Sequence, residues 1–307
     1  MLDPGIAVAL SSVSNELRAA TRVPLQELKA GHEAAAALCR KLGRSCKALR
    51  EAKKVNWICY GLTADELKLL GTLGSVLPAL EKLALCEQTA GPEGVQQLAA
   101  GLGAGALPAV TWLRISGTHV GDAGASALAA ALGKGALPRL ENLILCNAAI
   151  GDAGLVALAP ALRRLPALEE LALYANPLGD EGLAALVAPP QPAGAPPPAT
   201  GGPAKLKWLS LNETQVTDDG CGILAAALDS GALPALEELF LDSIPASAAA
   251  KAAVYAARAD LKSGDSESEH EESGSEEEES EEESEEESEE EEDEGEDEAG
   301  EEDGEGL

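Results

Sequence analysis

The chain has 307 residues, and its formal net charge of −31 comes from 53 acidic and 22 basic side chains. The charge is concentrated at one end, because residues 263–307 contain 24 Glu and 4 Asp but no Lys or Arg. A nearly neutral body with a strongly acidic tail excludes a nucleic-acid binder that works through overall positive charge, and it argues against docking on anionic membranes.

The first segment, residues 1–54, is predicted to be a helical cap, with helical sequence over residues 6–54. It contains a cluster of basic side chains, namely Arg40, Lys41, Arg44, Lys47, Arg50, Lys53 and Lys54. Three interpretations remain open for this cluster. The first is a solvated helix face, and the second is a surface that attracts the acidic tail of the same chain. The third is a nucleic-acid contact, for which the tail would compete.

Residues 55–262 contain an internal repeat. Six segments share the frame L-x-x-L-x-L, in which Val or Ile sometimes replaces Leu. Their central leucines are Leu83, Leu113, Leu143, Leu171, Leu209 and Leu239. Residues 55–60, followed by 63–73, look like a degenerate first unit. A repeat in which equivalent leucines return at nearly regular intervals predicts a solenoid, in which each unit packs only on its neighbours.

Each frame is followed by a tight turn and then by a sequence with helical spacing. The turn reads G-D-x-G at 121–124, 151–154 and 179–182, and T-D-D-G at 217–220. We expect the Asp side chain to accept hydrogen bonds from backbone N–H groups at a helix start. Apolar residues then return one helical turn apart, as at Leu128 and Leu132. The unit is therefore a strand, a turn and a helix.

Two segments interrupt or end this pattern. Residues 188–203 are rich in Pro, Ala and Gly, and they predict a disordered loop inserted into the fourth unit. Residues 247–262 are rich in Ala and predict a helix that closes the solenoid.

Together, the strand frame and the G-D-x-G turn resemble leucine-rich-repeat proteins of the ribonuclease-inhibitor-like type. The resemblance implies an α/β solenoid with a curved parallel sheet on its concave side and helices on its convex side. It also implies a protein partner held on the concave side. The chain is therefore predicted to consist of a helical cap at 1–54, a solenoid at 55–262 and a disordered acidic tail at 263–307.

Side chains alternate between the two faces of a strand, so the residues between the leucines are predicted to face the concave side. Most of the chain's few aromatic residues fall there. The candidate protein-binding residues are Trp57, Trp112, Arg114, Tyr174, Trp208, Asn212 and Phe240. Exposed rings favour a binding interface, but an alternative is that they pack on one another along the sheet and stiffen it.

Seven serines of the acidic tail have an acidic residue three positions later, a pattern that resembles casein kinase 2 acceptor sites. These candidate phosphorylation sites are Ser266, Ser268, Ser273, Ser275, Ser280, Ser284 and Ser288. Each phosphate would add about −1.5 to −2 charges. The tail is interpreted either as a solubilising polyelectrolyte or as an arm that captures basic proteins by charge.

No enzymatic motif is present, and the three His residues lie far apart in the sequence. We expect no catalytic residue, no metal and no cofactor. The six cysteines show no C-x-x-C spacing, and no secretory signal opens the sequence. We therefore expect reduced thiols in an intracellular protein, cytoplasmic, nuclear or both.

The sequence thus predicts a non-catalytic scaffold that binds a protein partner on the concave face, while its tail contacts basic proteins. A Ran-type GTPase-activating protein is an alternative, because such proteins resemble this chain in joining ribonuclease-inhibitor-type repeats to an acidic tail; the partner would then be a small GTPase. A histone-chaperone-like acidic protein is a further alternative, with histones as partners. Direct nucleic-acid or membrane binding is not expected.

Overall fold

The structure is a computed structural model, and it describes residues 33–58, 60–73, 77–86, 90–117, 119–187 and 203–263. Most of the predicted inserted loop, the acidic tail with its seven candidate phosphoserines, and the first 32 residues lie outside the described residues.

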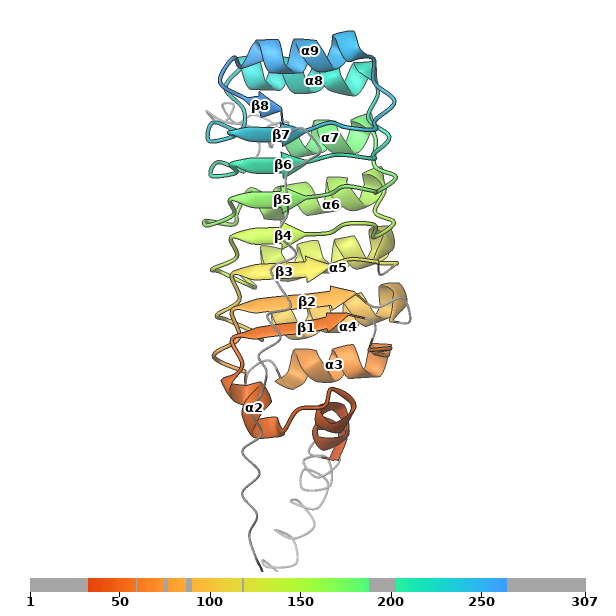
Figure 1. Cartoon of the computed structure of the whole chain (residues 1–307), viewed down its shortest axis with the longest axis vertical. Helices are drawn as coiled ribbons and strands as arrows, with labels where there is room; N and C mark the ends of the chain where they lie inside the picture. Colours follow the sequence, from red (N-terminus) through yellow and green to blue (C-terminus); the bar gives the residue numbers. More distant parts are fainter. Residues whose placement is uncertain are drawn as a thin grey trace, which may run out of the picture. The chain divides into compact units, whose positions relative to one another are not determined.

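The described part of the chain alternates strands and helices around a parallel sheet (Figure 1). The strands pair in sequence order and are β1 (Lys54–Ile58), β2 (Lys82–Cys86), β3 (Trp112–Ile115), β4 (Asn142–Ile144), β5 (Glu170–Ala172), β6 (Trp208–Ser210), β7 (Glu238–Phe240) and β8 (Lys262–Ser263). The helices are α2 (Cys46–Glu51), α3 (Ala64–Leu73), α4 (Gly91–Gly103), α5 (Gly121–Gly133), α6 (Asp152–Leu162), α7 (Asp180–Val187), α8 (Asp218–Asp229) and α9 (Ala248–Ala257). From α3 onward, each helix packs on the next along one face of the sheet.

The core is a continuous stack of leucines between the sheet and the helices. Equivalent residues of successive strands are aligned, so that Leu83 pairs with Leu113 and Leu113 pairs with Leu143. All three side chains are buried. A single repeat could not bury its leucines alone, and stacking removes them from water at about 25 cal/mol per Å² of apolar surface.

The aspartate of each turn accepts hydrogen bonds at a helix start, as expected, and it joins neighbouring repeats because this helix belongs to the next repeat. Asp152 Oδ1 accepts hydrogen bonds from the backbone N–H groups of Gly179, at 2.6 Å, and Gly182, at 2.9 Å, which belong to the next repeat. Asp122, Asp180 and Asp218 make equivalent contacts with their own next repeats. The carboxylate therefore satisfies donors that a helix N-terminus leaves unpaired.

The second glycine of the turn makes room for this carboxylate. A Cβ atom on Gly182 would lie 2.8 Å from Asp152 Oδ1, and one on Gly154 would lie 2.6 Å from Asp122 Oδ1. Both distances are shorter than carbon–oxygen van der Waals contact. The Asp of one repeat and the last Gly of the next form one packing unit, which explains why they recur together.

One buried asparagine ties two turns of the solenoid. The Nδ2 group of Asn176 donates to the carbonyls of Leu145, at 2.7 Å, and Leu173, at 2.9 Å. Its Oδ1 atom accepts from the backbone of Ala148 and Ile150, both at 3.1 Å. The amide thus satisfies backbone groups of the preceding repeat that would otherwise be buried unpaired.

At the N-terminal end, the predicted long helix is divided. Residues 33–41 form one helix, which stops at Gly43, where φ is +63°, and α2 follows after the N-cap Ser45. Glycine adopts this left-handed conformation without steric cost, so it ends the helix here.

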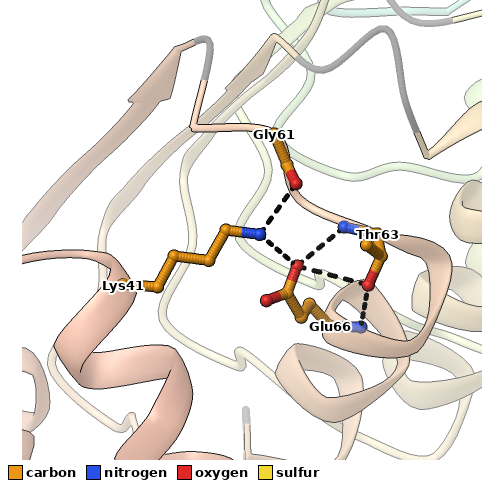
Figure 2. A network of polar contacts seen from close by, with 4 residues as sticks. All are labelled: Lys41, Gly61, Thr63 and Glu66. Carbon is orange, nitrogen blue, oxygen red and sulfur yellow. Dashed lines mark hydrogen bonds and ion pairs between the residues drawn. The ribbon is translucent and has the colours of Figure 1, made fainter.

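A polar network attaches the first of these helices to the solenoid (Figure 2). The Lys41 ammonium donates to the Gly61 carbonyl and to Glu66 Oε2, both at 2.7 Å. The same carboxylate accepts from the backbone of Thr63 at 2.8 Å, while the Thr63 hydroxyl lies 3.4 Å from the Glu66 backbone N–H, as in a capping box. Burial by itself raises the pKa of Glu66, but the hydrogen bonds and charge of Lys41 and the bonds from Thr63 lower it overall.

At the C-terminal end, the closing helix is shorter than predicted. It ends at Ala257, and the chain then forms β8, which extends the sheet by a strand that the sequence pattern did not indicate. Arg258 stabilises this turn, because its guanidinium donates to the carbonyls of Leu233, at 2.6 Å, and Ala232, at 2.7 Å.

A double-mutant cycle tests the link between repeats. Asp152→Ala should lower the free energy of unfolding by about 1–3 kcal/mol, because two buried N–H donors lose their acceptor. Gly182→Ala should also destabilise the protein, but by less in the Asp152→Ala background, since the contact with Oδ1 is gone while the Cβ still lies 3.3 Å from Asp152 Cα and Leu155 Cβ. Urea unfolding measures the free energy of unfolding of the original protein, the two single variants and the double variant. If the two substitutions change the free energy of unfolding additively, Asp152 and Gly182 do not act as one packing unit.

A second prediction concerns the cap network. Glu66→Gln should lower the free energy of unfolding by about 1 kcal/mol at pH 7, because the amide cannot pair with Lys41. A carboxylate with a lowered pKa stabilises the fold above the unfolded-state value and loses this contribution as the pH falls through the folded-state value. Urea unfolding at pH 7 and at acid pH should therefore show the deficit only at pH 7. Asp65→Asn, an exposed change on the same helix, is the control and should have a smaller effect.

Candidate protein-binding site

One face of the sheet carries no helices, and we call it the open face (Figure 1). Three repeat positions line it as rows that run across the strands. The first row is Lys54, Lys82, Trp112, Asn142, Glu170, Trp208, Glu238 and Lys262. The second row is Asn56, Ala84, Arg114, Ile144, Ala172, Ser210 and Phe240. The third row follows the strand ends and includes Ser116, Cys146, Tyr174, Asn212 and Asp242.

Trp57 does not belong to this face, and its predicted position is wrong. The register aligns Trp57 with the buried Leu85, and its side chain is only 2% exposed. Ile58, the next residue of β1, is 42% exposed. The degenerate first unit lacks the leucine frame that fixes the phase, and strand β1 places Val55 and Trp57 in the core.

Trp208 and Phe240 form an aromatic pair on the open face. Their ring centroids are 4.9 Å apart and the ring planes are tilted by 46°. Trp208 is partly exposed, whereas Phe240 is 6% exposed. A tilted contact at this distance is a favourable aromatic arrangement. Phe240 therefore supports the Trp208 ring more than it presents a surface of its own.

Trp112 and Arg114 lie two residues apart on β3, and both are partly exposed. The neighbours of Trp112 in the first row are Lys82 and Asn142, which are not aromatic. The Arg114 guanidinium donates to the Ser116 hydroxyl at 3.0 Å. This contact orients a cationic group on the open face, as the sequence predicted.

Tyr174 is half-buried beside Cys146 in the third row. Burial raises the pKa of the Cys146 thiol to about 12, although a hydrogen bond with Tyr174 and the charge of Arg114 oppose this. Burial, together with the neighbouring Cys146, also raises the pKa of Tyr174 to about 12. Both groups are therefore neutral at physiological pH, and Tyr174 presents a neutral hydroxyl rather than a base.

Asn212 has a structural contact that the sequence did not indicate. Its Oδ1 atom accepts a hydrogen bond from the backbone of Asp242 at 2.7 Å, which joins the ends of β6 and β7. The Oδ2 atom of Asp242 is buried and has no hydrogen-bond partner among the described residues. Asn212 therefore holds the sheet as well as lining the open face.

Acidic side chains gather around Trp208, and sequence reasoning did not select them as part of the site. They are Glu170 and Glu238, which pair with Trp208 in the register, and Glu169 and Glu237, which flank Lys207 at the position before it. Lys207 lies among them and pairs with Glu169 at 2.8 Å. The pKa of Lys207 is raised by Glu169 first and then by the charges of Glu237 and Glu170. The repeated Glu-Glu dipeptides in the sequence could have indicated these acidic residues. Only the strand register shows that they lie beside the strand that carries Trp208.

The described residues offer little to catalysis or to an ion. No group of three or more His, Cys, Asp or Glu side chains in the described ranges is arranged to hold a metal. A cavity between helices α4–α6 and strands β3 and β4 is lined by leucines and Ala131, which provide no polar side chain for a substrate. Among the helices that the structure describes, none is long and apolar enough to cross a membrane.

The burial of Cys146 leads to a prediction about thiol reactivity. Because the thiolate is the reactive form, Cys146 should resist iodoacetamide at pH 8, whereas the half-buried Cys86 should be alkylated. Peptide mass spectrometry after timed quenching measures both sites. In urea the two should react at similar rates, and equal rates in the folded protein would contradict the buried environment of Cys146.

Proteins similar to parts of this chain include leucine-rich-repeat proteins. A family model described as Leucine Rich repeat matches residues 110–129, which include β3. A solved internalin from Listeria monocytogenes is similar at 16% identity and a TM-score of 0.36, with 64% of this chain and 50% of that chain covered. A leucine-rich-repeat protein from Leptospira interrogans is similar at 16% identity and a TM-score of 0.31, with 64% and 51% covered.

The chain thus spans about half the length of either protein. The search of curated proteins gave no match. The repeated strand, turn and helix, with leucines aligned in parallel strands, make the described part of the chain an α/β leucine-rich-repeat solenoid.

Proposed function

We propose that this protein is a non-catalytic scaffold that binds a protein partner on the open face of its sheet. The observation that carries the proposal is the position of Trp112 and Trp208, two partly exposed rings at the same repeat position on the face that has no helices. Tryptophan is among the residues that contribute most to protein interfaces, because it buries a large area at a low entropic cost. The repeat length of about 30 residues further supports the ribonuclease-inhibitor-like subtype.

The backbone of the face is held in place before any partner arrives. In-register strand pairing, the Asn212 contact and the buried leucines fix the strands that bear the rings. A preorganised surface loses less entropy on binding than a flexible one. Solenoids generally use such extended sheet surfaces to bind other proteins.

The contact between Trp208 and Phe240 also supports the alternative that rings stiffen the sheet. That explanation does not extend to Trp112, whose neighbours in the row are Lys82 and Asn142. We therefore assign stiffening to Phe240 and partner contact to the two tryptophans.

The acidic segment 263–307 is proposed to attract basic proteins through its charge, as a histone-chaperone-like protein would. A Ran-type GTPase activator would act differently. It would accelerate single-turnover GTP hydrolysis by Ran at catalytic amounts, with or without residues 263–307. A scaffold leaves the hydrolysis rate unchanged, so this assay separates the two functions.

Substitutions on the two sides of the solenoid test the binding face. Trp112→Ala and Trp208→Ala should each weaken capture of a partner about tenfold or more, since removing an interface tryptophan costs on the order of 2 kcal/mol. Matched controls are Val156→Ala and Ile223→Ala on α6 and α8, where the side chains are 40% and 39% exposed. Partners are quantified by mass spectrometry after affinity capture, with urea unfolding to verify folding. If the helix-side changes weaken capture and the tryptophan changes do not, the proposed face is wrong.

A further inference from the structure

The charges of the open face are separated along the sheet. Strands β1 to β3 present Lys54, Lys82 and Arg114, whereas the first row of β5 to β7 presents Glu170 and Glu238. The register position before this row has Lys53 and Glu81 at the basic end, Glu141 in the middle, and Glu169, Lys207 and Glu237 at the acidic end. Two lysines, Lys207 and Lys262, offset only part of this negative charge. The second half of the open face is therefore acidic.

Trp208 lies at the centre of this acidic half. It pairs with Glu170 on one side and with Glu238 on the other, in the same row. Adjacent strands are about 4.8 Å apart, so a carboxylate borders the ring on each flank. Trp112, at the same repeat position, has Lys82 and Asn142 as neighbours instead.

The carboxylates beside Trp208 are available to a further cation. The nearby Lys207 pairs with Glu169 at 2.8 Å, and Glu170 contributes only the smallest of the three acidic charges that raise the pKa of Lys207. Glu238 reaches Lys262 only at 4.0 Å, and the Lys262 side chain is 73% exposed. An exposed ion pair at this distance contributes little, so a ligand cation competes with it easily.

We infer that the open face of β5–β7 binds an extended, basic segment of the partner, with an arginine or lysine side chain placed over Trp208 between Glu170 and Glu238. The inference rests on the proposed function and specifies the chemistry of the partner. A cation attracted both by an indole face and by flanking carboxylates is held more strongly than by either alone.

Other occupants fit this surface less well. A metal ion finds no complete ligand set here, because the described residues include no group of three or more His, Cys, Asp or Glu side chains that could hold one. An acidic peptide or a nucleic acid would be repelled by the same carboxylates. The chain's own acidic residues 263–307 carry the same sign of charge and are disfavoured here as well.

Fluorine NMR of the full chain labelled with 5-fluorotryptophan tests the inference at one residue. The protein has three tryptophans, so three resonances are expected, and Trp→Phe variants assign them. The probe is a short peptide in which arginine alternates with serine, and the control is the same peptide with citrulline in place of arginine. The arginine peptide should shift the Trp208 resonance saturably, leave the buried Trp57 unchanged and affect Trp112 less. The citrulline peptide should shift none of them.

Charge variants give the second measurement. Glu170→Gln with Glu238→Gln should weaken the binding that the Trp208 resonance reports by about tenfold at low salt, and by less at high salt, because screening reduces attraction between exposed charges. The matched control removes two carboxylates from the helix side, Asp65→Asn with Asp229→Asn, and should change the affinity less than twofold.

The outcomes separate this inference from the proposed function. If the arginine peptide binds by calorimetry but the Trp208 resonance does not move, binding occurs elsewhere, as on the acidic tail, and the inference is overturned. It is also overturned if the citrulline peptide shifts Trp208 equally. In either case, loss of partner capture by Trp208→Ala would still support the proposed binding face. If capture is unaffected by that variant, the proposed function fails, whatever the peptide does.

Discussion

In-register pairing of parallel strands is the constraint on which this structure depends. Residues at the same repeat position become neighbours in space, so each feature of one repeat is placed beside its counterpart in the next. The leucines stack into a continuous core, and the turn aspartates reach the backbone of the following repeat. A solenoid built in this way is a sum of nearest-neighbour interfaces. Its surface is then organised in rows instead of isolated patches.

The same constraint organises the open face. Each row contains one side chain from each repeat. Where the residue at this position differs between repeats, the chemistry of the row changes along the sheet. The pattern here runs from lysines on β1 and β2 to glutamates on β5 and β7, with a tryptophan in each half. A partner bound on this face, as proposed, would meet rigidly spaced rings in two different electrostatic surroundings. This arrangement favours specificity through charge complementarity as well as affinity through buried aromatic area.

Much of the fold was predictable from the sequence because its signals are local and repeated. The L-x-x-L-x-L frame fixed the phase of β2 to β7, and this phase correctly placed Trp112, Tyr174 and Trp208 on the open face. The prediction failed where repetition was absent. Strand β1 has only Val55 to suggest its inward phase, so Trp57 was assigned to the wrong face. Strand β8 is two residues long and has no leucine frame at all.

The sequence by itself determined the repeating unit, the leucine core and the uneven distribution of charge, since each is a property of composition or spacing. Only the tertiary structure decided which residues of different repeats touch. It assigned each turn aspartate to the next repeat, supported Trp208 with Phe240 and placed Glu170 and Glu238 on its two sides. Such contacts join residues about 30 positions apart, and their existence depends on strand register, which is settled by the packing of the whole core.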